Sequence, residues 1–284
     1  MLRQRVLTAL VLAALLLASL LPSDPLPFAL LALVFCAVGM GEWARLSGYR
    51  HGAVVVWAAG WAAVAGGALF LLERQGWGLP PAWVWFWGGC TALWVVLLAR
   101  SLPVAHLPSG LRDGLVLASL GFLLLLAAWL ALVELRVRGA LFMLSMLALV
   151  WAADIAAYFG GRAWGRSKMA PVISPGKTWA GAWTAMAAAL LYSIGCVLAA
   201  GAAAHGAASN YFGELQQRLG WAGMLLAVAF LLGFAIGGDL FESLLKRAAG
   251  VKDSGRLLPG HGGVLDRIDA LIPTLPLALL LMTL

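Results

Sequence analysis

Charged residues are scarce in this sequence, since Asp, Glu, Lys and Arg make up 11% of its 284 residues. A soluble domain usually has about 25%. Hydrophobic residues reach 63%, and the mean hydropathy is +0.95. These values exclude a soluble, disordered or collagenous chain, and we expect no nucleic acid partner. The net charge of +7 is therefore interpreted first as a sign of membrane topology.

Cysteine is scarce as well. Cys36, Cys90 and Cys196 each stand alone inside an apolar run. Their spacing gives neither a disulfide pair nor a set of metal ligands. We expect all three to be packing residues.

Long apolar runs recur along the whole chain. A membrane-spanning helix needs about 20 such residues, so the sequence predicts an all-α integral membrane protein with about nine transmembrane helices. The first run follows Arg3 and Arg5 and is alternatively a secretory signal, although no Ala-x-Ala-like cleavage pattern follows it. Residues 201–218 are expected to form an external loop. The predicted spans are 6–21, 27–46, 53–72, 82–99, 113–133, 139–161, 178–200, 220–245 and 265–283.

The basic residues orient these spans, because cytoplasmic loops collect Lys and Arg. With nine spans and a cytoplasmic N-terminus, only Arg74, Arg136, Arg138 and Arg218 of the 19 basic residues fall outside. The C-terminus is then external. We divide the chain into an N-terminal transmembrane region, 1–138, with about five spans, and a C-terminal catalytic region, 139–284, with about four spans and cytoplasmic motif loops. A short chain of this kind is expected in a bacterial inner (plasma) membrane.

Charge concentrates near the C-terminus, where ten charged residues lie between positions 239 and 269. An acid inside a span costs on the order of 2.5–3.5 kcal/mol, so such residues are candidates for function. Asp239, Glu242 and Lys246 have the spacing of one helix face. Asp266 and Asp269 share a face at the start of the ninth predicted span.

Two interpretations of these charges remain open. The acids pair with Lys246, Arg247 and Arg267 in a purely structural network, or several of them bind a divalent cation. Two carboxylates about 4 Å apart repel each other by about 4 kcal/mol at an effective dielectric constant of 20. Oxygen ligands that leave room for water and phosphate suit Mg²⁺.

The segment between the two acidic faces is rich in glycine, at positions 250, 255, 260, 262 and 263. Glycine lets backbone N–H groups approach an anion, and Lys252, Arg256 and Arg267 supply positive charge. This pattern predicts polyphosphate binding, and we expect His261 to contact phosphate rather than transfer a proton. The alternative is that these residues only form the turns of an ordinary loop and bind no phosphate.

A second basic loop lies on the same side of the membrane. Asp154, Tyr158 and Arg162 form a polar stripe at the end of the sixth predicted span. Ser174–Thr178 is expected to form a turn, with hydroxyl groups and Lys177 as phosphate contacts. A basic anchor loop with helix-capping residues is an equally good interpretation.

The C-terminal pattern resembles the signature of the phosphatidate cytidylyltransferases, also called CDP-diacylglycerol synthases. The segment "SPGKTWAG" resembles the second motif of that family, although Gly176 replaces a usual basic residue and Ala180 a usual acid. The resemblance is specific over about 150–270. Its residues are Ser243, Lys246, Arg247, Lys252, Asp253, Gly255, Pro259, His261, Gly262, Gly263, Asp266, Arg267 and Asp269.

The resemblance implies a helical membrane enzyme, dimeric and Mg²⁺-dependent, that converts phosphatidate and CTP to CDP-diacylglycerol and pyrophosphate in phospholipid biosynthesis. Its active site would face the cytoplasm. Asp239 and Asp266 match the expected metal ligands. The candidate catalytic residues are Asp239, Asp266, Lys246 and Arg267. The candidate substrate-binding residues are Ser174, Lys177, Thr178, Arg247, Lys252, Asp253, His261, Gly262, Gly263 and Asp269.

Two other functions remain as alternatives. A CTP-dependent polyprenol or lipid kinase would use similar phosphate chemistry. A membrane transporter also places acids in spans, but it usually has charges near the bilayer midplane and paired broken helices in two repeats. The sequence shows charges at the cytoplasmic ends of the predicted spans and no such repeat.

Overall fold

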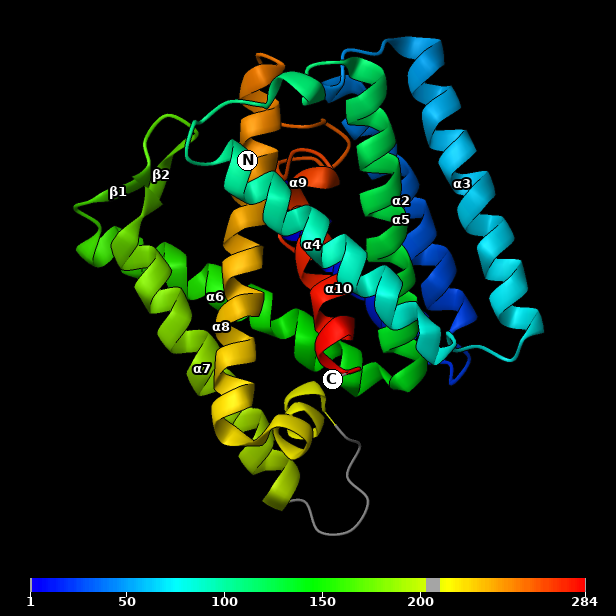
Figure 1. Cartoon of the computed structure of the whole chain (residues 1–284), viewed down its shortest axis with the longest axis vertical. Helices are drawn as coiled ribbons and strands as arrows, with labels where there is room; N and C mark the ends of the chain where they lie inside the picture. Colours follow the sequence, from blue (N-terminus) through cyan, green and yellow to red (C-terminus); the bar gives the residue numbers. More distant parts are fainter. Residues whose placement is uncertain (1, 203–209, 284) are drawn as a thin grey trace.

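A computed structural model describes residues 2–202 and 210–283 and shows a bundle of α-helices with one small hairpin (Figure 1). Two short 3-10 helices, η1 (Pro81–Trp83) and η2 (Ser109–Leu111), precede α4 and α5. Two strands form the hairpin, β1 (Lys168–Ala170) and β2 (Ser174–Thr178). The α-helices are α1 (Leu2–Leu20), α2 (Leu26–Leu46), α3 (His51–Arg74), α4 (Val84–Ser101), α5 (Gly114–Arg138), α6 (Ala140–Trp164), α7 (Trp179–Ala202), α8 (Tyr211–Ala248), α9 (Leu265–Ile268) and α10 (Leu271–Leu281).

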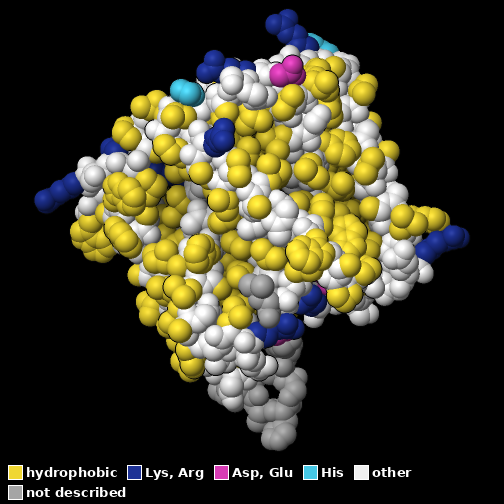
Figure 2. All heavy atoms as spheres, viewed as in Figure 1, with side chains coloured by type: hydrophobic (Ala, Val, Ile, Leu, Met, Phe, Trp, Pro, Cys, Tyr) yellow, Lys and Arg dark blue, Asp and Glu magenta, His cyan; other side chains and the backbone are white. Residues whose placement is uncertain are grey.

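The predicted all-α membrane fold is confirmed. Among the described residues, seven helices, α2 to α8, are long and apolar enough to cross a membrane. The apolar part of α1 is shorter, Val6–Leu20. Large apolar side chains such as Val56, Leu191 and Phe230 point outward from their helices. Figure 2 shows apolar side chains over much of the face in view, with Lys and Arg mainly at its margins. This surface suits contact with lipid.

The ninth predicted span differs from the structure, which has two shorter helices there. The 11 residues of α10 extend about 16 Å at 1.5 Å per residue, well short of the roughly 30 Å hydrocarbon core. A break at Asp269 and Ala270 separates α10 from α9. Most of α10 is buried between α4, α5 and α8 (Figure 1). Asp266 and Asp269, the acids at the start of this segment, are therefore held within the helix bundle.

Two further segments correct the sequence-based expectations. Residues 174–178 were expected to form a turn, but Ser174–Thr178 is strand β2, paired antiparallel with β1. Part of the expected external loop 201–218 is helical, because α8 begins at Tyr211 and bends at Gly220, where φ is 68°. Residues 203–209 of that loop lie outside the described residues. The bend coincides with the predicted start of the eighth span at 220.

The two ends of the described chain lie at opposite ends of the bundle (Figure 1). Near the start, the Thr8 hydroxyl donates to the carbonyl of Pro259, so α1 reaches the Gly-rich segment. Near the end, Thr283 shares a cavity with Leu79, in the loop that follows α3, and with Arg138, the last residue of α5. This arrangement agrees with an odd number of crossings.

The predicted boundary between regions 1–138 and 139–284 falls at Gly139, a break with φ of 140° between α5 and α6. Helices from both regions nevertheless pack together. In particular, α2 and α4 contact α8, and α10 packs on α4 and α5. The division into two regions stays a prediction.

Candidate active site

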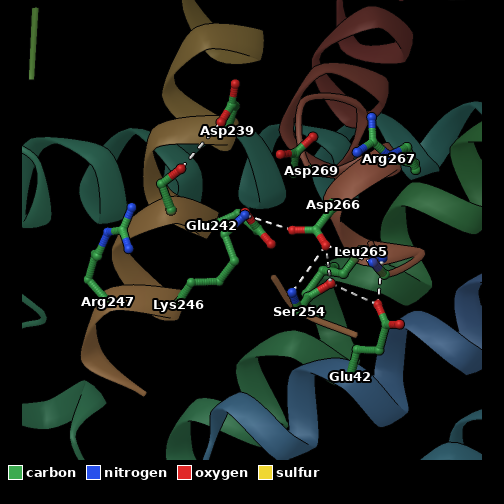
Figure 3. Close-up of polar contacts among 12 residues, drawn as sticks. Glu42, Asp239, Glu242, Lys246, Arg247, Ser254, Leu265, Asp266, Arg267 and Asp269 are labelled. Atoms are coloured by element: carbon green, nitrogen blue, oxygen red, sulfur yellow. Dashed lines mark hydrogen bonds and ion pairs between the residues drawn. The ribbon is translucent and has the colours of Figure 1, made fainter. Parts of the chain in front are cut away.

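One face of α8 carries Asp239, Glu242, Ser243 and Lys246, and α9 lies against it (Figure 3). The close approach depends on Gly238. A side-chain carbon at this position would lie 2.6 Å from the carbonyl oxygen of Asp269 and 2.6 Å from the ring of Pro273. Glycine avoids this clash because it has no Cβ. The sequence thus brings the acids of 266–269 beside those of α8.

Lys246 lies between two acids. Its ammonium forms an ion pair with Glu242, one turn away, and a 2.7 Å ion pair with Asp266 of α9. The side chains of Glu242 and Asp266 are 3% and 7% exposed. We call Glu242, Lys246 and Asp266 the Lys246 cluster. Removing one partner from such a buried set leaves an uncompensated charge, which is strongly destabilising.

Asp266 also organises the Gly-rich segment (Figure 3). Its Oδ2 atom accepts hydrogen bonds from the backbone N–H of Ser254 at 3.1 Å and of Gly263 at 2.8 Å. The Ser254 hydroxyl lies 3.0 Å from the same oxygen. The N–H of Gly263, which we expected to face a phosphate, is thus already bonded to a carboxylate. Gly262 lies beside it with a φ of 85°, where a Cβ would come within 2.8 Å of Asp266.

Lys177 forms a second charged cluster around Asp239, two helical turns before Lys246 on α8. Its ammonium lies 2.6 Å from the Asp239 carboxylate and 3.5 Å from the carbonyl oxygen of Ile236. Asp154 of α6 and Asp269 are both within electrostatic reach of Asp239 and Lys177. We call Asp154, Lys177, Asp239 and Asp269 the Lys177 cluster. Asp154 entered the sequence analysis only as part of a polar stripe, although it is an acid within a predicted span.

A cavity of about 410 Å³ opens beside the Lys177 cluster, between α6, α7, α8 and the hairpin. Asp154, Lys177 and Asp239 line its polar side. Ala153, Leu232 and Ala235 line its apolar side. Small-molecule sites have volumes of roughly 300–1,000 Å³ and combine an apolar wall with a few polar groups. The cavity therefore suits a ligand that is part apolar and part anionic.

The hairpin holds the second predicted motif. Thr178 is buried, and its hydroxyl oxygen accepts a hydrogen bond of 3.1 Å from the N–H of Gly181 in the first turn of α7. Gly161 and Gly165 lie close enough that a Cβ on either would come within about 3.0 Å of Thr178. Thr178 is therefore a helix cap as well as a cavity residue. Ser174, at the other end of β2, is half-buried.

Two predicted residues, Arg247 and Arg267, brace loops. Arg247 donates to the carbonyl of Ile173 in the hairpin turn at 3.3 Å. Arg267 donates twice to the carbonyl of His261, at 3.0 and 2.6 Å, and lies within electrostatic reach of Asp154. Among the described residues, the buried His261 Nδ1 atom has no hydrogen-bond partner.

In the part of the chain that the structure describes, no hydrogen bond or ion pair joins Lys252 or Asp253 to either cluster. They line a separate surface cavity of about 510 Å³ together with Arg45 and Arg256. The structure thus brings together the predicted residues of α8, α9 and the hairpin. It leaves Lys252 and Asp253 on the neighbouring surface.

Glu42, an acid near the end of α2, was not among the predicted site residues. It is completely buried and accepts hydrogen bonds from Ser254 and Leu265 in the signature segment. The rule that marks acids inside spans as functional candidates also applies to Glu42, since 27–46 was a predicted span. The contacts of Glu42 with Ser254 and Leu265 could not be predicted from the sequence.

The groups around the predicted metal ligands Asp239 and Asp266 are carboxylates and lysines. Within the described part of the chain, no group of three or more His, Cys, Asp or Glu side chains is arranged to hold a metal ion. The Lys177 cluster nevertheless combines three carboxylates with one lysine, and carboxylate oxygens are ligands that Mg²⁺ prefers. Lys177 and Lys246 each contact one of the two predicted ligands, Asp239 and Asp266.

The fold and site define a polytopic helical membrane protein with a basic loop region and an acidic site between helices. The model of the cytidylyltransferase family matches residues 3–284. The chain therefore belongs to the cytidylyltransferase family, as the resemblance indicated.

Individual relatives agree with this assignment. A phosphatidate cytidylyltransferase of Pseudomonas aeruginosa is 37% identical over 284 residues, covering 97% of this chain and 95% of the relative. Enzymes of the same name from Haemophilus influenzae and Brucella suis are 40% and 49% identical over 139 and 127 residues. These two matches cover 49% and 45% of this chain and 44% and 41% of the relatives.

Proposed function

We propose that this protein transfers the cytidylyl group of CTP to phosphatidate, giving CDP-diacylglycerol and pyrophosphate. One structural observation carries the proposal beyond the family. The cavity between α6, α7 and α8 joins an apolar wall to the Lys177–Asp239 pair. Phosphatidate has this same combination, acyl chains and an anionic headgroup. The family match and the named relatives support the same reaction.

The reaction demands positioning more than proton transfer. The phosphate monoester of phosphatidate is already an anionic nucleophile. One of its oxygens forms a bond to the α-phosphorus of CTP, and the bond from that phosphorus to the bridging oxygen breaks. Pyrophosphate leaves with the bonding electron pair. Lys177 lies where it can neutralise the lipid phosphate, and Lys246, Arg247, Lys252 and Arg267 supply positive charge for the triphosphate.

We further propose that Asp239 and Asp266 hold Mg²⁺, with Asp269 nearby (Figure 3). The ion would neutralise charge on the phosphates. The remaining predicted residues, Ser174, Thr178, Asp253, His261, Gly262 and Gly263, are proposed to contact substrate or to shape the loops that do.

A transfer assay tests the reaction. Purified protein is incubated with phosphatidate in micelles and CTP labelled at the α-phosphate. We expect label in the lipid and release of pyrophosphate, both lost in Asp239→Asn and Asp266→Asn variants that remain folded. Transfer of the γ-phosphate to a polyprenol would instead identify a lipid kinase. Solute uptake by proteoliposomes without label transfer would identify a transporter.

We also propose an inner-membrane location with the active site facing the cytoplasm. A test uses a cysteine in the Gly-rich segment, Arg256→Cys, after Ala replacement of Cys36, Cys90 and Cys196. A membrane-impermeant maleimide should label it in inverted vesicles and not in intact spheroplasts. Gln75→Cys lies directly after the C-terminal end of α3, which is proposed to be external. It should be labelled in intact spheroplasts and not in inverted vesicles. Labelling of Arg256→Cys from outside would refute this orientation.

The homodimer implied by the family resemblance is a proposal as well. One chain has a mass of 29.8 kDa. Light scattering of the detergent-solubilised protein, corrected for bound detergent, should give twice that mass. A mass of one chain over a hundredfold range of concentration would contradict it.

A further inference from the structure

Glu42 joins the N-terminal helices to the signature segment, although it lies outside the resemblance at 150–270. It lies one turn from the end of α2 and is completely buried. Its Oε2 atom accepts a 2.7 Å hydrogen bond from the N–H of Leu265 and lies 3.0 Å from the Ser254 hydroxyl. Among the described residues, its Oε1 atom has no hydrogen-bond partner. A buried carboxylate with an unused oxygen is costly, which favours a functional reason for its presence.

Both contacts of Glu42 lead to Asp266 (Figure 3). Leu265 directly precedes Asp266 in α9. The Ser254 hydroxyl oxygen lies 3.0 Å from Glu42 and also 3.0 Å from Asp266. A hydroxyl has one hydrogen to donate, so Ser254 donates to one carboxylate at a time and keeps both in place. Glu42 therefore fixes the Asp266 backbone on one side and its hydrogen-bond partner on the other.

Two glycines of the Gly-rich segment make this approach possible. A Cβ at Gly255 would overlap Oε1 of Glu42. A Cβ at Gly263 would overlap the Ser254 hydroxyl and lie 2.5 Å from Oε2 of Glu42. These glycines were expected to serve a phosphate. The structure shows that they also leave room for a carboxylate from α2.

We propose that Glu42 is a positioning residue for the transfer reaction, acting through Ser254 and Leu265 to orient Asp266. The inference rests on the proposed function, since it concerns the efficiency of that reaction. It assigns the N-terminal region a part in the active site. A carboxylate suits the role because it only accepts hydrogen bonds, and charged acceptors bind donors more strongly than neutral ones.

The test compares Glu42→Ala, Glu42→Gln and Ser254→Ala with the wild type. Glu73, an exposed acid at the end of α3, gives the matched controls Glu73→Ala and Glu73→Gln. For each folded variant, kcat and the KM for CTP are measured in the transfer assay. Deuterium uptake is measured for peptides that cover residues 250–266.

Loss of a residue that supports an active-site ligand typically costs 10–100-fold. We expect kcat to fall by about that factor in Glu42→Ala and Ser254→Ala, with the KM for CTP changed less than about twofold. Glu42→Gln keeps an acceptor for Leu265 and Ser254, so it should retain roughly tenfold more kcat than Glu42→Ala. Faster deuterium uptake at 250–266 should accompany the loss, and both Glu73 variants should match the wild type.

Several results would overturn the inference. One is a Glu42→Ala protein with kcat within about twofold of wild type. Another is an equal loss in Glu42→Gln and Glu42→Ala, since the acceptor would then be irrelevant. If Glu42→Ala does not fold, a Ser254→Ala variant with wild-type kcat would also overturn the inference. A wild type that transfers no label refutes the proposed function instead, and faster exchange in Glu42→Ala would still support the contact with α9.

Discussion

The Lys177 ammonium lies 2.6 Å from the Asp239 carboxylate and joins the hairpin to the C-terminal third of α8. The two residues come from separate motifs of the sequence, and each was proposed as a site residue for its own reason. Their contact places both at one cavity, beside Asp154. This shared position turns two motif predictions into one candidate site.

Replacing Lys177 should slow the transfer reaction without unfolding the protein. The Lys177 side chain is 24% exposed and that of Asp239 is 36% exposed, so their ion pair contributes little to stability. We expect Lys177→Met to lower kcat/KM by on the order of 10²-fold, because a charge-neutralising group is lost. Lys177→Arg should retain more activity than Lys177→Met. The measurement is label transfer to phosphatidate, with Arg166→Met, an exposed residue outside the cavity, as the control. Wild-type kcat/KM in Lys177→Met would contradict the site.

Replacing Lys246 should destabilise the protein. Lys246→Met leaves Glu242 and Asp266 buried without a positive partner. Breaking such a set by removing one member costs about 3–5 kcal/mol. We expect a clearly lower melting temperature in detergent, and partial recovery in the double variant Lys246→Met with Glu242→Gln. The exposed Lys168→Met is the control. An unchanged melting temperature in Lys246→Met would show that the Lys246 cluster does not stabilise the fold.

Gly263 and Gly176 should respond differently to alanine. Gly263→Ala places a methyl group against Ser254 and Glu42, whereas nothing lies within 4 Å of a Cβ at Gly176. Overpacking of a tight site costs about 1–3 kcal/mol. We expect Gly263→Ala to lower both the melting temperature and kcat, and Gly176→Ala to change neither. Equal behaviour of the two variants would argue against tight packing around Gly263.

Removal of divalent cations should abolish transfer. We expect protein treated with EDTA and desalted to be inactive, and Mg²⁺ to restore its activity. Ca²⁺ should restore less, because it prefers a larger and less regular set of oxygens. The measurement is label transfer against the concentration of free cation. An Asp239→Asn protein should need more Mg²⁺ if any activity remains. Full activity in EDTA would exclude Mg²⁺ as the cofactor.

The sequence alone determined that the chain is a helical membrane protein and indicated the family to which it belongs. Apolar runs of spanning length are a local property, because each helix satisfies its own backbone hydrogen bonds in lipid. The signature residues from Ser243 to Asp269 were identified by their resemblance to the phosphatidate cytidylyltransferases. The predicted start of the eighth span at 220 coincides with the bend at Gly220, although the bend itself was not predicted.

The tertiary structure decided which distant groups meet. Glu42 and Asp154 lie in spans whose apolar patterns say only that the helices cross the membrane. Helix association in lipid depends on small residues and close packing between helices, and contacts such as Glu42–Leu265 follow from that packing. The short helix α10 and the strand β2 also depend on tertiary contacts that the local sequence does not reveal. Gly238 lets the start of α10 sink against α8, and pairing with β1 extends a segment that alone resembles a turn.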